Sequence, residues 1–401
     1  MTSAGQLLAS LEAVNASSFP DEAERIRARD AVFETLRRIQ SPWDIAWDQN
    51  WVNPAINAAV KTLINAGVFK KWADEAGGAP ITCSKMSELT GADELLIRIR
   101  MMPAISGQFL VQEVAQDTYA RTAWAKALAE NPSFAGMYGG FYHELNSQMF
   151  RTLPFYLMET GFKNPTNVDC NFQFWQGDKN TNMFQYVGTN PRLKSDFNDA
   201  MECHSKHNLT PWVDIYPTDT VLASAATTGD GQSRPLVVDI GSGKGHDLKK
   251  FLARHPDIFT GSLVLQDLPN ILKGVDVGPV IKAQPPDFLT PQPAESEGAR
   301  VYFMHNVLHD WPDETAKNIL QTLAPAMKKG YSRLLIHESL VSSVKPLSRV
   351  TVSDITMMAC LAVAERSEEQ WRELVASAGL GIVKIWRPVQ SVESIIEVEV
   401  A

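Results

Sequence analysis

Residues 237–245 read Val-Val-Asp-Ile-Gly-Ser-Gly-Lys-Gly, an apolar run that ends in an acidic residue and three alternate glycines. This pattern predicts a buried strand that turns tightly into a helix, because glycine accepts positive φ and lets a ligand approach bare backbone. The next apolar segment, Leu263–Gln266, is followed by Asp267. Asp267 lies about 20 residues beyond Gly245, where a ribose-binding carboxylate is expected. The stretch therefore predicts a site for a ribose-bearing cofactor.

The glycine spacing indicates which cofactor this site takes. It is G-x-G-x-G, whereas dinucleotide-binding loops have G-x-G-x-x-G. With Asp239-Ile240 directly before it, the loop resembles the S-adenosylmethionine loop of class I methyltransferases; the alternative is an ordinary strand-to-helix turn. We expect the cofactor at the loop and at the end of the next strand, on Asp239, Gly241, Ser242, Gly243, Gly245, Asp267 and Leu268.

The composition argues against several classes of protein. A chain of 401 residues that is 44% hydrophobic and 21% charged has the make-up of a globular protein with two or three domains. Its net charge of −9 argues against a nucleic-acid partner. The four scattered cysteines form no disulfide framework, and neither a signal sequence nor a membrane-spanning apolar run is present. We expect a cytoplasmic protein that acts on a small molecule.

The first part of the chain predicts two helical regions. Residues 1–45 form an amphipathic arm without a core of its own, and such an arm usually packs on a partner, so we expect a homodimer. Residues 46–125 begin with a helix from Asn53, as N-cap, to near Gly67, and continue in the helix–turn–helix–extended order of a winged helix. DNA binding is one reading of this order, and a dimerisation and lid module is the other. Two arginines on an acidic chain make a poor phosphate-binding surface, so we favour the second.

Residues 126–225 are rich in aromatic side chains, which include Phe174 and Trp175. These flat side chains form either part of the core or the wall of a pocket for a planar hydrophobic substrate. The polar, glycine-bearing run that ends near Pro235 predicts a loop, and the cofactor domain, residues 226–401, begins in it.

Strands and helices alternate through residues 226–401. The expected strands are Leu236–Ile240, Leu263–Gln266, Pro279–Ala283, Arg300–Met304, Arg333–His337, Ile382–Trp386 and Ile395–Val400, of which the last two form a hairpin. This order predicts an α/β fold: a Rossmann-like methyltransferase domain with a mostly parallel seven-stranded sheet, preceded by a mainly α, winged-helix dimerisation domain.

Polar residues follow the fourth and fifth strands, where ligands of parallel sheets bind. His309 and Asp310 follow the fourth strand, Glu338 follows the fifth, and Glu365 precedes a helix that Ser367 and Gln370 cap. A histidine between two carboxylates is held in one tautomer and becomes a stronger base, which suits deprotonation of a phenol before in-line methyl transfer. The alternative is that His309 lies in a simple turn and the glutamates lie on the surface.

Residues from about 50 to 401 resemble the caffeate-type and fungal secondary-metabolite O-methyltransferases. The segments DIGSGKGHDL, QDLPN, PDF, LHDWPDE and ERS occur in the order of that family. The resemblance implies a general base at His309 flanked by Glu338 and Glu365, with adenine contacts at Asp287 and Phe288. It also implies a substrate pocket at Met357, beside Asp310, Phe174 and Trp175. His305 stands where relatives commonly carry a basic residue, which leaves its contact with the cofactor open.

Two other functions remain as alternatives. The fold also resembles that of pericyclases, which sometimes keep the cofactor; some of them replace the histidine base, whereas His309 is present here. A winged-helix regulator would bind nucleic acid with a steep salt dependence. A phenol is the expected acceptor, and a carboxylate remains open. Because histidines such as His246 and His337 lack metal-ligand spacing with carboxylates along the chain, we expect no metal.

Overall fold

The computed structural model describes the chain except for residues 1–3, 167–168, 207–209, 226–233, 242 and 389–391. The chain divides into two compact units, Met1–Lys126 and Ala127–Ala401. Among the helices of the described residues, none combines the length and the apolar character of a membrane span.

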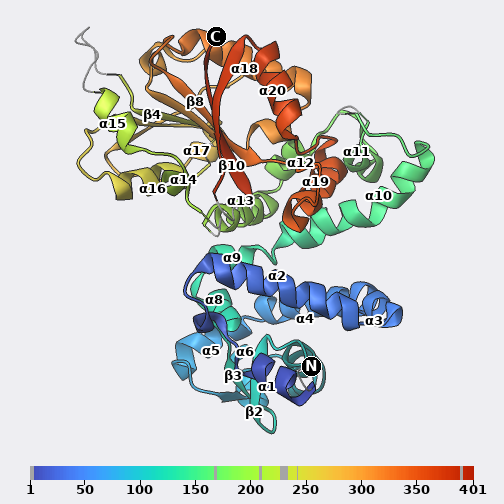
Figure 1. The fold of residues 1–401 in the computed structure, drawn as a ribbon. Coiled ribbons are helices and arrows are strands. Elements are labelled where there is room, and N and C mark those ends of the chain that lie inside the picture. The colour runs from blue at the N-terminus through green and yellow to red at the C-terminus, as the bar shows by residue number, and fades with distance from the viewer. Residues whose placement is uncertain (1–3, 167–168, 207–209, 226–233, 242, 389–391) are drawn as a thin grey trace. The chain divides into compact units, whose positions relative to one another are not determined.

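The first unit is mainly helical. Its helices are α1 (Ala4–Ala13), α2 (Glu22–Ile39), α3 (Pro42–Trp47), α4 (Asn53–Asn65), α5 (Val68–Ala76), α6 (Cys83–Thr90) and α7 (Met102–Ser106), and α8 (Ala123–Glu130) crosses into the second unit. A small antiparallel sheet has the order β1 (Ile81–Thr82), β3 (Thr118–Arg121), β2 (Val111–Ala115). Helices followed by a small sheet agree with the mainly α N-terminal region that the sequence predicts (Figure 1).

The prediction that Asn53 is an N-cap is wrong. A π-helical turn, Asp48–Val52, precedes α4, and the N–H of Asn53 already bonds to the carbonyl of Asp48. Asn53 therefore lies inside a continuous helical segment, in which Pro54 is tolerated near the start of α4. The end of α4 is as expected, since Gly67 adopts φ +75° directly after it.

The second unit contains the seven-stranded sheet that the sequence predicts. Its strand order is β6-β5-β4-β7-β8-β10-β9, in which β10 is antiparallel to both β8 and β9 and the other pairs are parallel. The strands are β4 (Val237–Ile240), β5 (Leu263–Gln266), β6 (Ile281–Gln284), β7 (Val301–His305), β8 (Arg333–Ser339), β9 (Leu380–Trp386) and β10 (Glu393–Val400). The mostly parallel Rossmann-like sheet is thereby confirmed (Figure 1).

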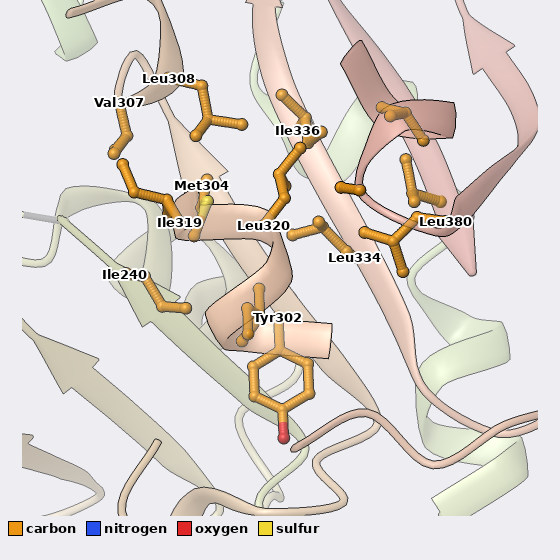
Figure 2. Packing of buried hydrophobic residues seen from close by; sticks show 14 of the residues in the cluster. Ile240, Tyr302, Met304, Val307, Leu308, Ile319, Leu320, Leu334, Ile336 and Leu380 are labelled. Carbon is orange, nitrogen blue, oxygen red and sulfur yellow. The ribbon is translucent and has the colours of Figure 1, made fainter. Parts of the chain in front are cut away.

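Apolar side chains cover both faces of this sheet, because successive residues of a strand point to opposite faces. On β7, Tyr302 and Met304 pack with helices α18 (Asp313–Leu323) and α20 (Glu368–Ser377) (Figure 2). Val301 and Phe303 face the other side, with α14 (Trp212–Ile215) and α16 (His246–Arg254). The sheet is thus a rigid, buried platform whose strand ends can hold functional side chains.

A third apolar cluster lies among helices beside the sheet. It joins α10 (Ser147–Glu159), α11 (Asn171–Gln176), α12 (Met183–Thr189) and α13 (Pro191–Lys206) to α19 (Ser348–Leu361). The shorter helices of this unit are α9 (Pro132–Gly136), α15 (Asp219–Ala225) and α17 (Pro269–Leu272). The buried amide of Asn171 donates hydrogen bonds to the carbonyls of Met149 and Ala359. Segments far apart in the sequence are therefore tied together next to the strand ends.

Candidate active site

The glycine loop follows β4 as expected. Gly241, Gly243 and Gly245 adopt φ of +74°, +56° and +72°. A Cβ on Gly241 would lie 2.7 Å from a methyl carbon of Val307, so this position excludes larger residues by close packing as well as by backbone conformation. Ser242, predicted to contact the cofactor, lies outside the described residues.

Asp267 links this loop to the end of β5. Its carboxylate accepts hydrogen bonds from the N–H of Gly243 at 2.8 Å and from the N–H of Leu268 at 2.7 Å. Burial raises the pKa of Asp267, while these two N–H groups act in the opposite direction. The side chain of Leu268 is half exposed. The predicted ribose carboxylate is therefore held in a fixed position next to the glycine loop.

Asp239 has a buried carboxyl group whose polar contacts are incomplete. It is 1% exposed, and among the described residues neither of its oxygens has a hydrogen-bond partner. Burial raises its pKa well above the ordinary range. A buried polar group in this state calls for a ligand that donates hydrogen bonds. The amine and hydroxyl groups of S-adenosylmethionine fit this carboxyl group and the glycine cradle beside it.

The predicted adenine residues follow β6. The Phe288 ring packs edge-on against Trp311, with the ring centroids 5.9 Å apart, and so lies next to the turn that carries His309. Asp287 accepts a hydrogen bond from the N–H of Leu289, and this bond stabilises the loop that contains both residues. The contact of these residues with adenine remains a prediction.

His309, Glu338 and Glu365 come together at the ends of neighbouring elements. His309 lies in a short 3₁₀ turn, Leu308–Asp310, after β7, and its ring is almost buried. Its Nδ1 atom lies 3.2 Å from Oε1 of Glu365 and 3.8 Å from Oε2 of Glu338. The two glutamates are buried, so the alternative that they are surface residues does not hold.

Glu338 also holds the turn itself. Its Oε1 atom accepts hydrogen bonds from the N–H groups of Val307 at 3.0 Å and Leu308 at 2.9 Å. One carboxylate oxygen therefore anchors the backbone while the other faces the imidazole. This double role explains why a glutamate at the end of β8 is buried completely.

Sequence reasoning missed three residues that position the site. Ser353 donates a hydrogen bond to Oε1 of Glu365 at 2.7 Å, and Asp354 accepts the N–H of Glu365 at 2.8 Å. Arg366 donates to the carbonyls of Leu308 and Trp311, at 2.9 and 2.7 Å. In the sequence, the position of Arg366 directly after Glu365 was the one feature that could have indicated its role.

The charges of the site raise the proton affinity of His309. Burial lowers its pKa, but the negative charges of Glu338, Asp310 and Glu365 outweigh burial and raise the pKa to about 10. Burial raises the pKa of Glu338 to about 7 and that of Asp310 to about 6. His309, which lies among three acidic groups, therefore holds its proton more tightly than an exposed histidine does.

The predicted substrate residues are less closely grouped. Asp310 lies at the site, with Oδ1 3.6 Å from Nε2 of His309. Met357 lies on α19. The same helix carries Ser353, which donates a hydrogen bond to Glu365. Phe174 packs against Tyr156, and Trp175 packs against Phe172 and Tyr186, in the helical cluster. Substrate contact for all four residues remains a prediction.

His305 belongs to a separate buried group. Its Nδ1 atom lies 2.6 Å from Asp247 and its Nε2 atom lies 3.0 Å from Glu393. Both ring nitrogens are thus engaged by carboxylates within the chain. A direct contact of His305 with the cofactor remains a prediction.

A parallel sheet with a glycine loop, a ribose-type carboxylate and a buried histidine at the strand ends defines the class of protein as a cofactor-dependent methyltransferase. A model of the O-methyltransferase domain family matches residues 162–381. The O-methyltransferase mfmE of Annulohypoxylon moriforme is 34% identical over 399 residues, covering 98% of this chain and 95% of that protein. The chain belongs to the O-methyltransferase family, which confirms the resemblance in the sequence.

Solved structures agree with this fold over the whole chain. LepI in complex with SAM has a TM-score of 0.88 at 24% identity and covers 100% of both chains. A pericyclic reaction enzyme has a TM-score of 0.88 at 23% identity, covering 99% of this chain and 100% of that one. At these identities the likeness establishes the fold. Together with the family match, it identifies the chain as an S-adenosylmethionine-dependent O-methyltransferase.

Proposed function

We propose that this O-methyltransferase of secondary metabolism methylates a phenolic hydroxyl of a planar, hydrophobic small molecule, with His309 as general base. The observation that carries the proposal is the buried imidazole with a glutamate oxygen 3.2 Å from its Nδ1 atom. Glu365 fixes the tautomer and the ring orientation, which leaves Nε2 to accept a proton. A phenol, with a pKa near 10, needs such a base at neutral pH.

Two groups of residues would have separate functions, one in binding the cofactor and one in positioning the base. Asp239, Asp267 and the glycine loop would hold S-adenosylmethionine, which supplies a methyl group on a positively charged sulfur when bound. Glu338 and Arg366 hold the turn that carries His309. Because methyl transfer to a phenoxide depends on alignment, these fixed contacts act mainly by orienting the base and the acceptor.

The proton on His309 must leave before the residue acts as a base. Since three carboxyl groups raise its pKa, a cation bound beside the imidazole lowers the pKa again by repulsion. When S-adenosylmethionine is bound, its positive charge would favour the neutral form of His309. Deprotonation of the substrate would then depend on the presence of the methyl donor.

The experiment is incubation with S-adenosylmethionine and a panel of planar phenols, with matched aromatic carboxylic acids and methyl ethers as controls. Mass spectrometry should find products that are one methyl group heavier, from the phenols alone. Methylation of the carboxylic acids only would replace the phenol by a carboxylate acceptor. Conversion without any mass increase would instead favour a pericyclic reaction, against which the presence of His309 argues.

We further propose a homodimer formed through the helical arm. Apolar side chains on α2 and along the segment that follows it are exposed in the single chain, among them Val32, Phe33, Leu36, Ile39, Trp43, Trp47 and Trp51. Trp47 and Trp51 stack with their ring centroids 5.0 Å apart, which gives a flat apolar surface. A patch of this kind is typical of protein interfaces.

We infer a cytoplasmic location from the state of the cysteines. All four are buried and none forms a disulfide. Free, buried thiols are typical of proteins from reducing compartments.

A further inference from the structure

A second cluster of histidine and carboxylate side chains lies outside the proposed catalytic group. His305 ends β7 and pairs in register with His337 on β8. Glu393 begins β10, two residues before Ile395, which is the partner of His337. Glu393 is therefore the diagonal neighbour of His337 on the same face. The pairing of the strands brings these three side chains together, although they are far apart in the sequence.

The distances in this cluster match those between the ligands of one ion. Oε2 of Glu393 lies 3.0 Å from Nε2 of His305 and 3.5 Å from Nε2 of His337. All three ligand atoms lie within 4.8 Å of one another. In a tetrahedral zinc site, with bonds of about 2.0–2.2 Å, neighbouring ligand atoms are roughly 3.3 Å apart. Small rotations of the two rings, whose centroids are 4.2 Å apart, would direct both nitrogens to one ion.

His337 is the member of the cluster that most needs a further ligand. It is 1% exposed, and among the described residues neither ring nitrogen has a hydrogen-bond partner. Its Nε2 atom lies 3.5 Å from Oε2 of Glu393, and a neutral imidazole nitrogen in this position can coordinate an ion. A buried imidazole in this state is costly unless something binds it.

The surroundings of the cluster orient the other two ligands. Asp247 lies 2.6 Å from Nδ1 of His305, so a hydrogen bond there directs Nε2 toward Glu393. Asn306 donates a hydrogen bond to Oε1 of Glu393 at 3.1 Å, and Oε2 is the oxygen that faces the two histidines. Carboxylate–histidine pairs of this kind are the usual support of metal-binding histidines.

We propose that His305, His337 and Glu393 bind one divalent transition-metal ion, with Zn²⁺ as the ion of choice, through Nε2, Nε2 and Oε2. The ion would replace the hydrogen that bridges His305 and Glu393, and it would join β7, β8 and β10. Two imidazoles and a carboxylate select such ions over Mg²⁺ and Ca²⁺, which prefer oxygen ligands alone. This structural site revises the expectation of no metal and does not depend on the proposed phenol acceptor.

A second histidine–carboxylate group, His309 with Glu338 and Glu365, has similar spacing and provides the matched comparison. There one oxygen of Glu338 accepts backbone N–H groups and one oxygen of Glu365 accepts the hydroxyl of Ser353. This group offers one imidazole where the first cluster offers two, so it is the poorer site for a transition metal that prefers nitrogen ligands. Metal binding should therefore distinguish the two groups.

The test is titration of the metal-free full-length protein with Zn²⁺ by calorimetry, and with Co²⁺ by its visible absorption. We expect one equivalent per chain, with binding weakened at least tenfold by His337→Gln and by Glu393→Gln. Asp247→Asn, which removes the carboxylate that supports His305 and pairs with Lys250, should weaken binding by roughly 10- to 100-fold. His309→Gln should leave the affinity unchanged, and millimolar Mg²⁺ or Ca²⁺ should not compete.

Wild-type crystals soaked in Zn²⁺ keep the test independent of how the variants fold. Anomalous scattering at the zinc edge should give a peak between His305, His337 and Glu393. A peak only at His309, or none at saturating Zn²⁺, would overturn the proposal. So would calorimetry in which wild type and the folded His337→Gln protein bind Zn²⁺ equally.

Discussion

At the scale of single residues, the site depends on His309 and the three acidic groups around it. Its Nδ1 atom faces Glu365 and Glu338, while Nε2 faces Asp310. In the proposed mechanism each nitrogen has a different function: the carboxylates hold Nδ1, and Nε2 exchanges the proton.

Replacing His309 with glutamine should lower turnover by roughly 10²- to 10⁴-fold, because the acceptor then loses its proton without a positioned base. The affinity for S-adenosylmethionine should change little, since the proposed cofactor residues lie on the glycine loop and at Asp267. Steady-state kinetics and calorimetry measure the two effects separately. Wild-type turnover of a weakly acidic phenol by the variant would disprove the base assignment.

The raised pKa of His309 should also appear in the stability of the free protein. The folded value of about 10 lies above the ordinary value of 6.5, so the protonated imidazole stabilises the fold below pH 6.5. This contribution is lost as the pH rises through about 10. Urea unfolding of wild type and His309→Gln should show a stability difference that shrinks between these values. A difference that stays constant with pH would contradict the raised pKa.

Asp267→Ala should raise the dissociation constant of S-adenosylmethionine at least tenfold. Hydrogen bonds to a charged acceptor contribute roughly 1.5–3 kcal/mol each, and the carboxylate also holds the N–H of Gly243. Calorimetry with the folded variant gives the affinity directly. Unchanged binding would remove Asp267 from the cofactor site.

At the scale of elements, both side-chain packing and backbone conformation require glycine in the loop after β4. Gly241 and Gly261 both have positive φ, but a Cβ would meet Val307 at Gly241 and nothing within 4 Å at Gly261. Gly261→Ala should therefore cost about 1–2 kcal/mol from backbone strain alone. Gly241→Ala should cost more, as measured by urea unfolding. Equal losses would mean that Val307 moves aside freely.

Arg366 is the link between the turn of His309 and the loop of Glu365. Its guanidinium is buried and donates to two carbonyls of that turn. Arg366→Lys keeps the charge but loses the fork of donors, so kcat should fall while the KM for S-adenosylmethionine stays unchanged. Equal losses in kcat and cofactor affinity would point to a general loss of structure.

At the scale of the whole molecule, α2 and the segment that follows it, up to Trp51, expose large apolar side chains in the single chain. The protein should have the mass of a dimer in light scattering at micromolar concentration, because stacked tryptophans and exposed apolar residues favour a second copy. Trp47→Asp should shift it toward the monomer. Phe259→Asp, at an exposed position between α16 and β5, is the control and should leave the mass unchanged. A monomeric wild type that is fully active would contradict the dimer.

The sequence by itself determined the order and the type of the elements around the site. Apolar runs bounded by glycine and polar residues placed the strands within a few residues, and Leu263–Gln266 agrees with β5 at both ends. Local chemistry was sufficient here, because a buried parallel strand needs an apolar run and a capped helix needs a residue such as Ser367. The position of His309 after β7 agrees with this order, whereas Glu338, expected just after the next strand, lies within the last residues of β8.

Only the tertiary structure decided which polar side chains share a site. His305 and Glu393 are 88 positions apart in the sequence, and sheet register places them 3.0 Å apart beside His337. The divided role of Glu338, with one oxygen on the backbone turn and the other toward His309, likewise depends on atomic positions. Periodicity and propensity act over a few residues. Contacts between strand ends depend on how the whole sheet is ordered, which no local pattern in the chain encodes.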